Sequence, residues 1–69
     1  MNNRYKMSAE DRKAKLQELR TQLNNSLELI SEIKSISVSY QQYDHAATER
    51  EIEKLLEQSL KHVEGFLEM

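Results

Sequence analysis

Apolar residues in the first half of the chain recur at intervals of three and four positions. The intervals join Leu16, Leu19, Leu23, Leu27 and Ile30. Residues three or four apart lie on one side of an α-helix, so this spacing predicts a helix with an apolar stripe. Ser8 and Asp11 are typical of a capping box at its start, because the serine oxygen accepts an orphan backbone N–H. We therefore predict a first helix over about residues 8–38.

Three further aliphatic residues widen the apolar surface of this helix. Leu29, Ile33 and Ile36 lie well off the first stripe, toward the opposite side, at ~100° per residue. A single neighbouring helix covers only one stripe, so two interpretations stay open. One is a broad core face beneath the turn of a hairpin, and the other is a docking surface for a second chain.

A short connector without glycine or proline leads to a second helix. We predict this connector over residues 39–43. Two helix starts then compete, namely Asp44 as the N-cap, or Thr48 with Glu51 as a second capping box. The second helix is predicted over about residues 44–67. Its apolar stripe consists of Ile52, Leu55, Leu56, Leu60, Val63, Phe66 and Leu67, with Ser59 in the middle.

A connector this short between two helices favours antiparallel packing. The predicted fold class is therefore all-α, an antiparallel two-helix hairpin over residues 8–69 that follows a flexible N-terminus, residues 1–7. The chain has 69 residues and no cysteine, and a domain of this size buries only ~60% of the surface of its unfolded chain. We expect homo- or hetero-oligomerisation, in a coiled coil or helical bundle, to complete the fold.

Charge is distributed unevenly along the chain. Residues 1–20 hold six basic and three acidic side chains, a balance of +3, and residues 21–69 hold four basic and nine acidic ones, a balance of −5. Acids interrupt the cations of the basic end, so nucleic-acid binding is a minor interpretation beside a solvated helix face. No apolar run reaches the ~20 residues of a membrane span. We expect a cytoplasmic protein that does not bind membranes.

The residue types present offer little for catalysis. There is no cysteine, no glycine-rich phosphate loop and no pair of histidines at metal-binding spacing, since His45 and His62 are far apart. We expect no enzymatic activity, no cofactor and no metal. The candidate functional residues are instead those suited to a protein partner, because aliphatic and tyrosine side chains predominate at interfaces. These partner-binding candidates are Leu29, Ile33, Ile36, Tyr40 and Tyr43.

The second half of the chain carries features of a known family. Gln42 and Tyr43 precede an acid-rich turn, Glu49 to Glu53, which leads into an aliphatic stripe. The stripe continues through Leu55, Leu56, Glu57, Leu60 and Val63. In length and layout, over roughly residues 12–67, the chain resembles the small helical-hairpin cochaperones of the type III secretion needle subunit.

That resemblance implies a cytosolic complex of three proteins. The hairpin would stabilise a larger helical chaperone, and together they would hold the needle subunit unpolymerised before export. The alternative is a homodimeric four-helix bundle that acts as a regulator or adaptor, with nucleic acid as a possible ligand of its basic N-terminal helix.

Overall fold

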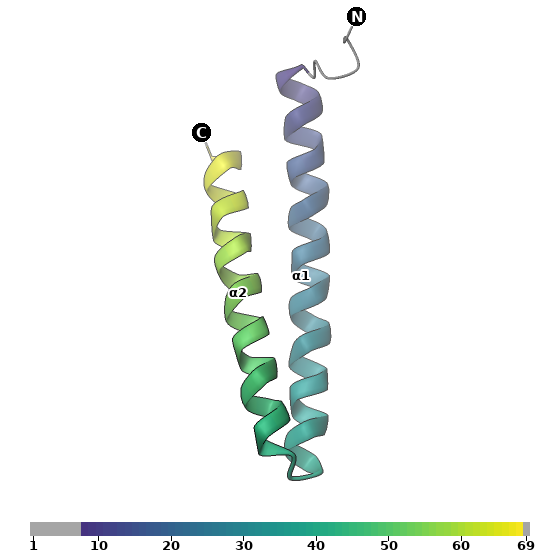
Figure 1. The fold of residues 1–69 in the computed structure, drawn as a ribbon. Coiled ribbons are helices and arrows are strands. Elements are labelled where there is room, and N and C mark those ends of the chain that lie inside the picture. Colours follow the sequence, from purple (N-terminus) through teal and green to yellow (C-terminus); the bar gives the residue numbers. More distant parts are fainter. Residues whose placement is uncertain (1–7, 69) are drawn as a thin grey trace, which may run out of the picture.

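The computed structural model describes residues 8–68 and consists there of two antiparallel helices (Figure 1). Helix α1 spans Ala9–Ser39 and helix α2 spans Tyr43–Leu67. The predicted fold class, an all-α helical hairpin, is confirmed. The flexible N-terminus predicted for residues 1–7 lies outside the described residues. Helix α1 has 31 residues against 25 in α2, so its first turns extend beyond the end of α2.

Helix α1 begins where the sequence predicts. Ser8 is the N-cap, and its side-chain oxygen accepts a hydrogen bond of 3.1 Å from the backbone N–H of Asp11. Glu10 and Asp11 place negative charge at the positive end of the helix dipole. The start of the hairpin is thus determined by residues close to it in sequence.

The turn between the helices is closed by backbone hydrogen bonds rather than by side chains. The N–H of Gln41 donates to the carbonyl of Val38 at 2.9 Å, and the N–H of Gln42 donates to the carbonyl of Ser37 at 2.8 Å. Together these bonds form a Schellman motif, which requires a left-handed residue after the helix. Gln41 fills that position with φ of 60°, where glycine is usual.

Helix α2 begins ahead of both starts considered from the sequence. Gln42 is its N-cap and makes no side-chain capping bond, while Asp44 lies in the first turn. The Thr48 hydroxyl donates to the carbonyl of Asp44 at 3.3 Å, as a residue inside a helix does. The physical reason is the Schellman turn, which returns the chain to helical geometry directly after Gln42.

The interface between the helices follows a heptad spacing. Along each helix the residues shielded by the partner helix recur at steps of three and four, as in a coiled coil. In α1 they are Leu16, Arg20, Leu23, Leu27, Ile30, Lys34 and Ser37; in α2 they are Ala46, Glu49, Glu53, Leu56, Leu60, Val63 and Leu67. We assign these residues to heptad positions a and d. Ser26, next to Leu27, is half-buried as well but lies outside this spacing.

This register differs in several places from the stripes expected from the sequence. Leu19 is 42% exposed, and Arg20 takes the interface position beside it. Ile52 and Leu55 also lie outside the interface, which Glu49 and Glu53 occupy instead. The remaining residues expected in the interface but exposed are Ser59 and Phe66. Leucines fill the interface near the middle of each helix, and regular helix geometry brings polar residues inward further along.

The left-handed Gln41 gives a test of the turn. Replacing Gln41 with Gly removes the steric cost of the left-handed conformation, which stabilises the folded chain by ~1–2 kcal/mol. The greater freedom of glycine in the unfolded chain opposes this gain by ~0.5–1 kcal/mol. We expect Gln41→Gly to raise the free energy of unfolding by up to about 1 kcal/mol. Urea denaturation followed by circular dichroism measures it.

The matched control is Gln58→Gly, which makes the same substitution at an exposed position inside α2. There the backbone is right-handed, so glycine should lower the stability by about 1 kcal/mol. Equal losses for both variants would show that Gln41 does not adopt the left-handed conformation.

Candidate partner-binding face

Near the turn, the interface between the helices is polar. The Lys34 ammonium donates to Glu53 Oε1 at 2.8 Å, and the Ser37 hydroxyl donates to Glu49 Oε2 at 3.0 Å. The other oxygen of Glu49, Oε1, is buried and has no hydrogen-bond partner among the described residues. We call Lys34, Ser37, Glu49 and Glu53 the polar layer.

The apolar part of the interface is correspondingly small. Among the described residues, Ile30 and Val63 are the buried apolar side chains, at 8% and 6% exposure, and no side chain is completely enclosed. Ten large apolar or aromatic side chains are exposed. The hairpin therefore leaves more large apolar side chains in water than it removes, which is the condition expected of a surface that another molecule covers.

On α1, the exposed apolar residues form a second line beside the interface. Leu29, Ile33 and Ile36 are 59%, 45% and 57% exposed. With Tyr40, the C-cap residue, they are spaced by four, three and four positions, which corresponds to heptad positions c and g. Four of the five partner-binding candidates thus lie together on one side of α1.

On α2, the exposed apolar residues lie on the same side of the hairpin. Ile52 and Phe66 occupy position g, and Leu55, 63% exposed, occupies position c. In an antiparallel pair the g positions of the two helices lie next to each other. The guanidinium of Arg12, at position g of α1, lies 5.2 Å from the centre of the Phe66 ring, which confirms this arrangement.

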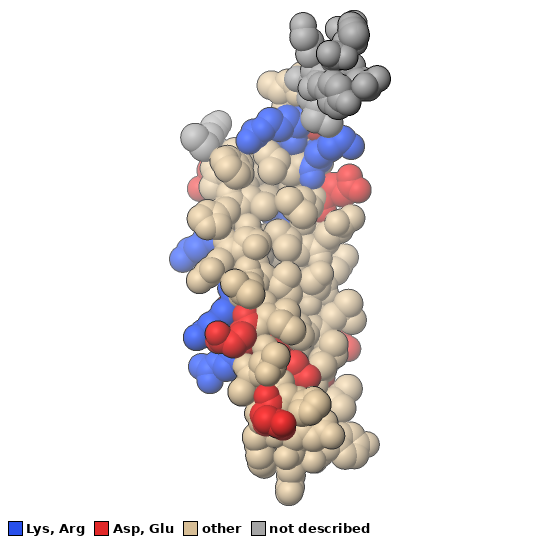
Figure 2. All heavy atoms as spheres, in the orientation of Figure 1, with Lys and Arg blue, Asp and Glu red and all other residues tan. Residues whose placement is uncertain are grey.

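Together these positions form one surface, which we call the uncharged face. Its members are Leu19, Gln22, Ser26, Leu29, Ile33 and Ile36 of α1, Tyr40 at the C-cap of α1, and His45, Thr48, Ile52, Leu55, Ser59, His62 and Phe66 of α2. None of these residues is Lys, Arg, Asp or Glu. Toward the open end, the next g and c positions of α1 are the cations Arg12 and Lys15. Figure 2 shows one face of the hairpin on which tan side chains form a band over both helices, with basic side chains near the open end and along the outer edge of α2, and acidic ones toward the turn.

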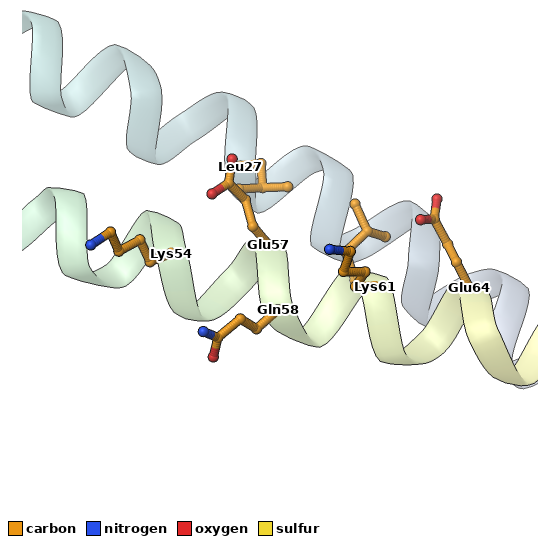
Figure 3. A pocket seen from close by; sticks show the side chains of 7 residues that line it. Leu27, Lys54, Glu57, Gln58, Lys61 and Glu64 are labelled. Atoms are coloured by element: carbon orange, nitrogen blue, oxygen red, sulfur yellow. The ribbon is translucent and has the colours of Figure 1, made fainter.

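The opposite side of the hairpin is charged. A surface hollow there is lined by Leu27 of α1 and by Lys54, Glu57, Gln58, Leu60, Lys61 and Glu64 of α2 (Figure 3). Cations and acids alternate along it, as on a solvated helix surface. The two sides of one hairpin thus differ in chemistry, although the same two helices build both.

Tyr43, the fifth candidate, does not join the other four. It lies at the start of α2 and lines a hollow with Lys34, Val38 and Arg50 on the charged side. Sequence reasoning also missed Leu19, Ile52, Leu55 and Phe66, which it assigned to the apolar stripes between the helices. A heptad register applied to both helices would have found them, because Ile52, Leu55, Ser59, His62 and Phe66 repeat the c and g spacing.

The described residues contain little that suggests other chemistry. Over residues 8–68, no group of three His, Cys, Asp or Glu side chains is arranged to hold a metal ion. His45 and His62 are exposed on the uncharged face, and His45 Nε2 lies 3.9 Å from the exposed Asp44 carboxylate. In the same part of the chain, neither helix combines the length and the apolar character needed to cross a membrane.

Fold and face together define a class: a small α-helical hairpin with one uncharged and one charged side. Comparisons with protein-family models, with curated proteins and with solved structures find no match for this chain.

The polar layer gives a stability prediction. Replacing Glu49 with Leu removes a buried oxygen without a partner and adds apolar surface to the interface. The Ser37 hydroxyl keeps an acceptor, since it can bond the backbone carbonyl of the preceding turn. We expect Glu49→Leu to raise the free energy of unfolding by about 1–2 kcal/mol, measured by urea denaturation.

Glu51→Leu is the control, since Glu51 lies two residues away and is exposed. Glu and Leu have similar helix propensities, so this change should shift the stability by no more than about 0.5 kcal/mol. If Glu49→Leu is the less stable of the two, the Ser37–Glu49 hydrogen bond contributes more than the orphan oxygen costs.

Proposed function

We propose that this chain is a non-enzymatic, cytosolic protein-binding module that docks a helical partner on its uncharged face. The observation that carries the proposal is the clustering of exposed aliphatic side chains from both helices. Leu29 and Ile36 of α1 and Leu55 of α2 are each more than half exposed on this one side. Contiguous apolar surface of this kind is typical of interaction sites.

The thin interface supports the same proposal. Two helices with two buried apolar side chains and a polar layer form a marginal fold, because small domains need added stabilisation. A partner that covers the uncharged face buries the remaining aliphatic residues and stabilises the hairpin by mass action. Binding and folding of this chain are then coupled.

In its most specific form, the proposal makes the chain a cochaperone. The resemblance to the small hairpins of type III secretion suggests that the partner is a larger helical chaperone, and that the pair holds a needle subunit unpolymerised. A function of that kind requires a hairpin with spare apolar surface and no catalytic group. The uncharged face supplies such a surface, with Ile33 near its middle.

A substitution at the centre of the face tests docking. Ile33→Asp places a carboxylate where the partner would bury it, and burying an unpaired charge costs several kcal/mol. We expect the affinity for the native partner to fall by on the order of a hundredfold or more. The measurement is capture from the native cells, identification of the partner by mass spectrometry, and titration of the purified pair.

Val38→Asp provides the matched control. Val38 is β-branched and exposed to the same degree as Ile33, 47% against 45%, but it lines the hollow on the charged side. The Val38→Asp variant should bind the partner with an affinity within about threefold of that of the parent chain. Circular dichroism should show both variants as helical as the parent chain. A complex that survives Ile33→Asp contradicts docking on the uncharged face.

A further inference from the structure

We draw no further inference here: the strongest candidate, the uncharged face that α1 and α2 form together, carries none, because the charges around it are of both signs and nothing in the structure shows what covers it.

Discussion

Each helix of this hairpin can place only one line of residues against the other, and that constraint organises the whole molecule. The a and d positions hold leucines in the middle of the hairpin and polar residues near the turn. Because Lys34, Glu49 and Glu53 take interface positions there, aliphatic residues at the same height, such as Ile33 and Ile52, are left outside. The exposed apolar surface is thus a direct consequence of the register.

The polar layer also explains why the helices keep this register. Sliding one helix by a heptad would place Glu53 against Leu27 in one direction, or Lys34 against Leu60 in the other. Either slide separates the ion pair and leaves one of its charges against a leucine. A charge without its partner in a shielded position is costly. The leucines further along would tolerate such a slide, since any leucine packs on any other. Lys34 and Glu53 therefore restrict the pairing, while the buried Glu49 oxygen limits its stability.

The two sides of the hairpin follow from the direction of its helices. An antiparallel pair brings position g of α1 beside position g of α2, so the aliphatic lines of both helices fall on one side. The mixed charges of Arg50, Lys54 and Glu57 then fall on the other. One broad face without charged side chains is a larger apolar surface than either helix presents alone. This gain comes from the turn rather than from additional residues.

The sequence by itself determined the two helices, the Ser8 cap, the antiparallel hairpin and the exceptional position of Leu29, Ile33 and Ile36, because these depend on local periodicity and on capping chemistry. It did not determine which apolar residues of each helix face the other helix of the hairpin. Ile52, Leu55 and Phe66 belong to a continuous stripe on the helical wheel, and only the pairing of α1 with α2 turns them outward. Nor did local pattern place Tyr43, which the left-handed Gln41 directs to the charged side. These features were decided by tertiary structure, because the register between two helices depends on how all their interface residues fit together at once.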